Sequence, residues 1–208
     1  DYQQAWKIYE SLPQTQKEAE YWNQFVKAWD AWRVENNKAF ELSRQFDQIG
    51  IQDPIDLARR LEQYTKDHYI LVNKIRQLLD DSSATFQGGD DHASCNTGRY
   101  FPTFQTTNSE LAAALRVFAA PHQRFHEAVG RIKTLVQNDN QEQARQVFQN
   151  EMMPAMQEVF GSFDTILAIV NNASDSMVAV QQQIMVPVRL RQEEATELLA
   201  KIVDINHE

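Results

Sequence analysis

Apolar residues recur along the chain at the spacing of an α-helix. Between positions 22 and 32 they lie three or four residues apart, which places them on one helix face. These residues are Trp22, Phe25, Trp29 and Trp32. Gly50 is of the residue type that ends helices, and Pro13 marks a kink or a short break upstream. The pattern predicts a first helix over residues 2–49.

Two further seams, meaning stripes of apolar residues along one face of a helix, each contain a histidine at a position expected to face the core. Asp53-Pro54 is a start signal, with an N-cap and a proline at the first helical position. The first seam is Leu57, Leu61, Tyr64, His68, Leu71, Ile75 and Leu78, and the second is Leu111, Leu115, Phe118, His122, Phe125, Val129, Ile132 and Val136. The alternating spacing of four and three predicts helices over 54–80 and 109–137. We expect Pro121 to bend the latter.

Two connections of different length complete the pattern. Residues 138–140 form a tight turn before a last helix over 141–205, in which we expect Pro154 and Pro187 to introduce kinks. Residues 82–107 are rich in Ser, Gly, Asp and Asn and predict a long loop. We expect this loop to be ordered, because it carries the single cysteine and three aromatic residues that can anchor it.

These elements predict an all-α fold with one domain over residues 1–208. Two of the three connections between the predicted helices are short, which favours an antiparallel, up-down-up-down four-helix bundle. The first and last helices are longer than the inner pair and would extend beyond it in the same direction. That geometry is expected if both ends of the domain lead into a membrane.

Composition and charge narrow the classes of partner. The chain has 208 residues, enough to bury a core, and only 6 Gly and 6 Pro, which suits long helices. A net charge of −9 argues against nucleic acid and anionic lipid as partners. No run of about 18 apolar residues predicts a membrane span. Because the chain begins at Asp1 and ends within a helical pattern at Glu208, we expect a segment of a longer protein.

Candidate chemistry is concentrated in three histidines and the lone cysteine. His122 and His126 are four residues apart and share a helix face. In antiparallel neighbours His68 would lie at the same depth as His122, and Cys95 lies 27 residues from each. Three imidazoles and one thiolate form a closed tetrahedral shell of the donors that Zn²⁺ prefers. The sequence therefore predicts one zinc ion at His68, Cys95, His122 and His126.

Other interpretations of these residues stay open. A single histidine on an apolar seam is more often a hydrogen-bonded core residue than a metal ligand. His92, three residues before Cys95, could replace one ligand, and His207 is expected to be solvated. The Trp and Met stripes are interpreted as core packing.

Residues 64–136 resemble the chemoreceptor zinc-binding domain of bacterial chemotaxis receptors and diguanylate cyclases. The matching motifs are Lys66-Asp67-His68, Cys95-Asn-Thr-Gly-Arg-Tyr and Pro121-His122-Gln-Arg-Phe-His126. The resemblance implies zinc at the same three histidines and one cysteine. The chain departs from the family at Leu71, where the family usually has Trp, and after the cysteine, where Thr97 and Tyr100 replace its usual Leu or Phe and Trp.

The first and last predicted helices look like the four-helix sensory modules of methyl-accepting chemotaxis proteins. The matching residues are Ala28-Trp29-Asp30-Ala31-Trp32 and the stretch Ala144…Phe148…Pro154-Ala155. Together the two resemblances imply a zinc-binding fold within the extracytoplasmic bundle of a transmembrane receptor.

We therefore expect a ligand- or metal-sensing domain of a bacterial transmembrane chemoreceptor, periplasmic and homodimeric. Zinc availability, oxidation of Cys95, or a small organic ligand between the helices of a homodimer are the candidate stimuli. An enzyme is disfavoured, because a closed four-ligand shell leaves no open position for substrate. The alternatives are a zinc-stapled dimerisation or partner-binding module, a metalloenzyme with Glu127 or Asp67 as base, and a cytoplasmic location.

Overall fold

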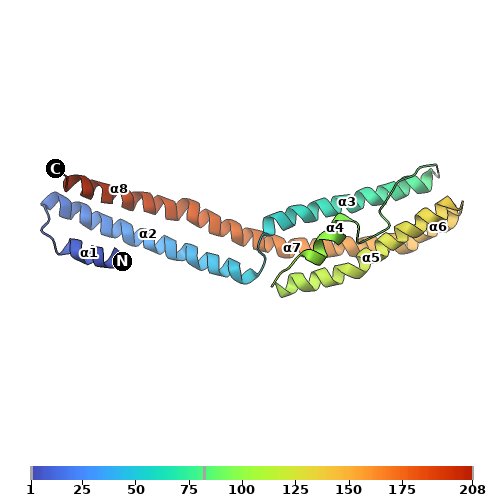
Figure 1. Cartoon of the computed structure of the whole chain (residues 1–208), viewed down its shortest axis with the longest axis horizontal. Coiled ribbons are helices and arrows are strands. Elements are labelled where there is room, and N and C mark those ends of the chain that lie inside the picture. The colour runs from blue at the N-terminus through green and yellow to red at the C-terminus, as the bar shows by residue number, and fades with distance from the viewer. Residues whose placement is uncertain (1, 82, 208) are drawn as a thin grey trace. The chain divides into compact units, whose positions relative to one another are not determined.

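The computed structural model describes residues 2–81 and 83–207, and these residues form helices and connecting segments with no strand. The predicted all-α class is confirmed. Figure 1 shows helices α1 (Tyr2–Glu10), α2 (Gln16–Ile49), α3 (Pro54–Asp80), α4 (Asn96–Tyr100), α5 (Ser109–Gln137), α6 (Gln141–Val147), α7 (Met153–Gln183) and α8 (Arg189–Ile205). A 3-10 turn, η1 (Phe101–Thr103), and two π-helical turns, η2 (Phe148–Met152) and η3 (Ile184–Val188), join them. Within the described residues, none of the helices has the length and hydropathy needed to cross a membrane.

Prolines and caps explain how the predicted long helices are divided. The range 2–49 is interrupted between α1 and α2, in the segment that contains Pro13. A capping box restarts the chain as α2: Glu18 N–H donates to Thr15 Oγ1 over 3.2 Å, and Thr15 N–H donates to Glu18 Oε2 over 3.3 Å. The range 141–205 contains both π turns, one just before Pro154 and one around Pro187. A proline has no N–H to donate, and a wider turn accommodates the missing bond.

Contacts divide the chain into two compact units, whereas we predicted one domain over residues 1–208. The first unit comprises residues 1–45 and 177–208, and the second comprises residues 46–176. The first has a small core of Phe25, Ala195 and Ile202, against which Trp6, Trp22 and Trp29 pack. Trp22 and Trp29 of the predicted stripe thus serve core packing.

A buried carboxylate joins the helices of the first unit. Glu18 of α2 is 5% exposed, and it accepts hydrogen bonds from Tyr9 Oη over 2.6 Å and from Asn206 Nδ2 over 2.9 Å. Tyr9 lies on α1 and Asn206 caps α8. The bonds from Tyr9 and Asn206 lower the pKa of Glu18, while burial and then the carboxylate raise the pKa of Tyr9 to about 12. The pair therefore stays a phenol and a carboxylate across ordinary pH.

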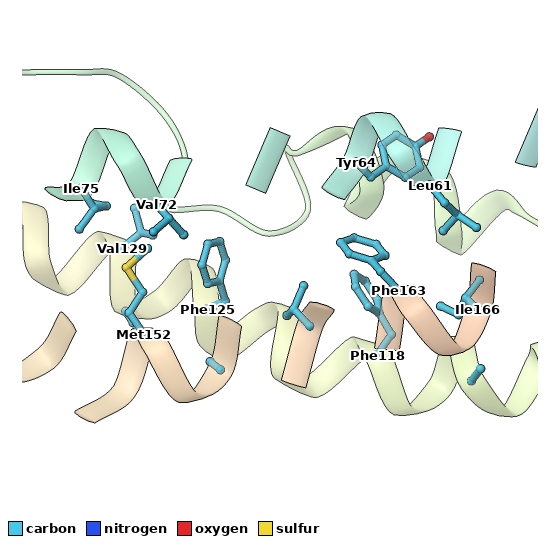
Figure 2. Packing of buried hydrophobic residues seen from close by; sticks show 14 of the residues in the cluster. Leu61, Tyr64, Val72, Ile75, Phe118, Phe125, Val129, Met152, Phe163 and Ile166 are labelled. Atoms are coloured by element: carbon cyan, nitrogen blue, oxygen red, sulfur yellow. The ribbon is translucent and has the colours of Figure 1, made fainter. Parts of the chain in front are cut away.

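The core of the second unit is built from α3, α5, η2 and α7. Figure 2 shows side chains from these elements facing one another in a row along the helices. The members shown and labelled are Leu61, Tyr64, Val72, Ile75, Phe118, Phe125, Val129, Met152, Phe163 and Ile166. Each is at most 5% exposed, so these apolar side chains supply the packing that positions the polar groups between them.

Helices α3 and α5 run in the same direction within this unit. Asn108, the N-cap of α5, donates through Nδ2 to the Ile49 carbonyl over 2.9 Å, a few residues before α3 begins. Further along both helices, Lys74 and Lys133 lie over the same ring, that of Phe86. Both helices therefore start at one end of the unit and advance together (Figure 1).

The following helical stretch runs opposite to both. Arg124 of α5 pairs with Glu158 of α7 over 2.7 Å, and Arg131, further along α5, pairs with Glu151, earlier in the chain. Near the turn at residues 138–140, Arg145 Nη2 donates to the Leu79 carbonyl at the end of α3 over 2.8 Å.

The predicted up-down-up-down order is therefore wrong for the helices at 54–80 and 109–137. The 27 residues of α3 rise only about 40 Å. The connection over residues 81–108 can cover roughly twice that length when extended, so it returns to the start of α3 before α5 begins. His68 and His122 share a depth because both lie about four turns from parallel helix starts.

The packing of this core predicts a large loss of stability on truncating Phe125, which is 0% exposed and whose ring centroid lies 5.5 Å from that of His68. Phe125→Ala is expected to lower the free energy of unfolding by about 3 to 5 kcal/mol, because it leaves a cavity as well as losing burial. Val117→Ala on the same helix, where Val117 is 67% exposed, is the control and should change it by less than about 0.5 kcal/mol. Urea denaturation followed by circular dichroism measures both. Equal effects would contradict the packing described.

Candidate metal centre

The four residues predicted as metal ligands lie together in the second unit. One donor atom from each of His68, Cys95, His122 and His126 lies within 4.8 Å of the others. His68 comes from α3, Cys95 precedes α4, and both remaining histidines come from α5. Cys95 Sγ is 3.2 Å from His122 Nε2, which is 3.1 Å from His126 Nε2. This cluster can hold a metal ion.

The hydrogen bonds of the histidines show which ring nitrogens face the cluster. His68 Nδ1 lies 2.7 Å from the Tyr64 carbonyl, and His126 Nδ1 lies 2.7 Å from the Gly89 carbonyl. A carbonyl oxygen only accepts, so we assign the ring proton to Nδ1 in both histidines. Each Nε2 then carries a lone pair, and within the described chain His68 Nε2 is buried without a hydrogen-bond partner.

The spacing of the donor atoms suits a tetrahedral ion. Zinc–nitrogen bonds of about 2.0–2.1 Å and zinc–sulfur bonds of about 2.3 Å place two nitrogens roughly 3.3 Å apart and nitrogen and sulfur roughly 3.6 Å apart. The two shortest separations described above, 3.1 and 3.2 Å, are a few tenths of an ångström shorter, and all donor pairs lie within 4.8 Å. In the metal-free protein a proton on Cys95 Sγ or on His122 Nε2 can be shared across these contacts, and a metal ion would take its place. A metal ion would also give His68 Nε2 the partner that it lacks within the described chain.

Burial sets the protonation of the cluster. It lowers the pKa of His122 to about 2 and that of His126 to about 4, helped by the neighbouring histidines, and it also lowers the pKa of His68. Neutral imidazole is the form that ligates a metal. Burial raises the pKa of the Cys95 thiol, against the effect of the N–H groups of Thr97 and Gly98. Metal binding would therefore displace a proton from sulfur but none from the histidines.

Local backbone geometry brings Cys95 to the helices. Cys95 is the N-cap of α4, and its sulfur accepts the Gly98 N–H over 3.2 Å. A Cβ at Gly98 would lie 1.7 Å from the His92 carbonyl oxygen, so a residue with a side chain does not fit there. Asn96 Nδ2 donates to Asp67 Oδ2 over 2.8 Å, which ties the residue after the cysteine to the residue before His68.

The segment before Cys95 supplies a second support. Gly89 has a φ of +85°, and its carbonyl orients His126. Lys133 Nζ donates to the Gly88 carbonyl over 3.1 Å, which holds this turn on α5. Gly88 and Gly89 lie in the Gly-rich loop predicted over residues 82–107, but their support of the site was not predicted. The only signal was a glycine pair in a loop, and nothing in it pointed to a particular histidine.

The remaining candidates lie outside the cluster. The ring centroid of His92 is 6.2 Å from that of His122, and His92 is not among the four clustered residues. His207 is exposed. Asp67 accepts from Gln63 and Asn96, and Glu127 is exposed and accepts from Gln123. Neither carboxylate belongs to the cluster.

Comparison of the chain with protein-family models, with curated proteins and with solved structures found no match. The resemblance to the chemoreceptor zinc-binding domain therefore stays a prediction, and the site is argued from its own geometry.

The lowered histidine pKa values predict that the metal-free protein loses stability in mild acid. The unfolded chain takes up protons near pH 6.5, whereas His126 resists protonation until about pH 4 and His122 until about pH 2. Stability therefore falls as pH drops through this window, and His126 alone should contribute about 3 kcal/mol of loss between pH 7 and pH 4. Urea unfolding in the presence of a chelator measures it. His126→Asn should show a shallower dependence on pH, and an unchanged slope would contradict the burial of a neutral imidazole.

Proposed function

We propose that this chain is a zinc-binding sensory domain of a bacterial chemoreceptor, and not an enzyme. Metal binding is supported by the convergence of three buried imidazoles and one sulfur within 4.8 Å. The sensory role is supported by the resemblance of residues 64–136 to the chemoreceptor zinc-binding domain. The chemical reactivity of a thiolate ligand also supports it.

The donor set favours zinc among the common metals. Calcium and magnesium prefer oxygen ligands, and none of the four donors is oxygen. Nitrogen and thiolate donors in a tetrahedron suit zinc. Four protein ligands fill the shell, which is typical of structural or regulatory zinc, since catalytic zinc keeps a position for water or substrate.

A stimulus at this site would act on three elements at once. His68 belongs to α3, the other two histidines belong to α5, and Cys95 holds the connection between these helices. Phe163 of α7 packs on the His68 ring with a centroid distance of 5.5 Å, so a change in the orientation of His68 is transmitted to α7. Loss of the metal, or oxidation of the Cys95 sulfur, would release the segment around α4 and favour a second packing of these helices.

Metal analysis of purified protein tests the ligand set. We expect wild type to hold about one zinc per chain and Cys95→Ala and His122→Ala to hold far less, because three ligands bind zinc more weakly than four. His92→Ala is the matched control, since this histidine is near the cluster but outside it, and it should keep its zinc. Equal zinc content in wild type and Cys95→Ala would show that the Cys95 thiolate is not a ligand. Loss of zinc in His92→Ala would make His92 a ligand.

The ease of zinc exchange distinguishes a sensory zinc site from a purely structural one. The alternative function is a dimerisation or partner-binding module in which the metal only fastens the long connection. A sensor should release zinc to a competing chelator at free zinc concentrations near those in the cell, and its helix packing should change on release. A site that keeps its metal through extended dialysis against the chelator would support the structural alternative.

We also propose that the chain forms a homodimer through its first unit. Ile184, Met185 and Val186 of η3 are 46%, 61% and 64% exposed, which leaves apolar surface for a second copy to cover. Met185→Glu should weaken self-association in sedimentation equilibrium, because it places a charge in that contact. Unchanged association would place the dimer contact elsewhere.

We place the domain in the periplasm, as part of a protein that spans the inner membrane. This rests on the resemblance to extracytoplasmic sensory bundles. Alkaline phosphatase, which is active only outside the cytoplasm, can be fused after residue 207 in the full-length protein. An active fusion is expected, and an inactive but stably produced one would support the cytoplasmic alternative.

A further inference from the structure

A cavity lies beside the metal centre, between α5 and the segment that follows Cys95. Its volume is about 740 Å³, which is within the range of about 300–1,000 Å³ typical of small-molecule sites. Leu115 and Phe118 of α5 form one wall, and Phe101 and Phe104 form the other. Apolar and aromatic walls of this kind favour an occupant with an apolar body of one or two rings.

The charge around the cavity is unlike that of the whole chain. The chain has 29 acidic and 20 basic residues, for a net charge of −9. Yet none of the described residues that line the cavity is acidic, and Arg116 is a lining cation. The other polar groups there include the side chains of His92, Gln105 and Gln123, all of which can donate hydrogen bonds. This lining favours an occupant with one anionic group.

The same cavity reaches the metal centre. His122, one of the four clustered residues, contributes to its lining, as do Thr97 and Gly98, the second and third residues after Cys95. The Phe101 and Phe118 rings meet edge to face with centroids 5.0 Å apart, which closes the wall between the cavity and the core. An occupant therefore contacts both α5 and the segment that positions the cysteine.

We propose that this cavity binds a small amphipathic anion, with an apolar aromatic or branched body and a single carboxylate or sulfonate, and that its occupancy changes how firmly Cys95 and His122 hold a metal. The first half stands on the cavity alone. The second half rests on the proposed function, and it makes the metal centre responsive to an organic ligand.

The binding test uses two fluorescent probes that share one apolar body. 8-Anilinonaphthalene-1-sulfonate carries a sulfonate, and N-phenyl-1-naphthylamine is the same body without it. We expect the sulfonate to bind the wild-type chain at one saturable site. Arg116→Gln should weaken the sulfonate about threefold to fivefold and leave the uncharged probe unchanged, because it removes only a partly solvated ion pair. Equal effects on the two probes would overturn the anionic assignment.

A matched pair of variants locates the site. Leu115→Glu places a carboxylate in the wall and should weaken the sulfonate at least tenfold. Val117→Glu makes the same change two residues along α5, at a 67% exposed position outside the cavity, and should weaken it less than twofold. Similar losses in both variants would overturn the site. Arg116 is exposed, so Arg116→Gln keeps the test decisive if Leu115→Glu fails to fold.

Zinc release to a colorimetric chelator tests the coupling. A saturating amount of the sulfonate probe should change the release rate of the wild-type protein at least twofold and leave that of Leu115→Glu unchanged. An unchanged wild-type rate would overturn the coupling but not the cavity. Absence of zinc from the wild-type protein would instead overturn the proposed function, while the probe measurements would still decide the cavity.

Discussion

The arrangement of the second unit depends on the burial of three imidazoles that face one another and a cysteine sulfur. Burial keeps them neutral, since a charged imidazole loses its hydration in the core, and for His122 and His126 the neighbouring histidines add to this effect. His122 Nε2 is 3.1 Å from His126 Nε2 and 3.2 Å from the cysteine sulfur. Buried polar atoms this close need a shared proton or a metal ion between them. The fold supplies four donor atoms that could hold a metal ion there.

Holding these groups in place requires contacts from distant parts of the chain. The carbonyl of Tyr64 orients His68 from within its own helix, but the carbonyl that orients His126 comes from Gly89, on the loop. The loop is in turn held by Lys133 on α5 and, through Asn96, by Asp67 on α3. Such supporting contacts fix the tautomer and direction of ligating histidines. The long connection is therefore part of the site and not only a link between helices.

This arrangement bears on how a helical sensor could respond. The centre lies where two parallel helices and their connection meet, and α7 packs against it through Phe163. The cavity lined by His122 and the residues after Cys95 borders the same groups. An event at the sulfur and an event in the cavity would thus act on one set of contacts. A shared set of contacts with two packings is the physical requirement for coupling between two sites.

Local sequence was sufficient for the helical class, for the cap at Asp53, and for the four clustered side chains. Helical periodicity, cap chemistry and donor type are properties of neighbouring residues, so they can be recognised without a structure. The relative direction of α3 and α5 could not be recognised, because a connection over residues 81–108 permits either direction and only the packing of side chains such as Phe125 and Phe163 selects one. We predicted that His68 and His122 lie at the same level on the assumption of antiparallel helices. In the structure they lie at the same level because the two helices are parallel. The role of Gly89 and the neighbouring cavity also came only from tertiary structure, since both depend on a loop folding back on helices distant in sequence.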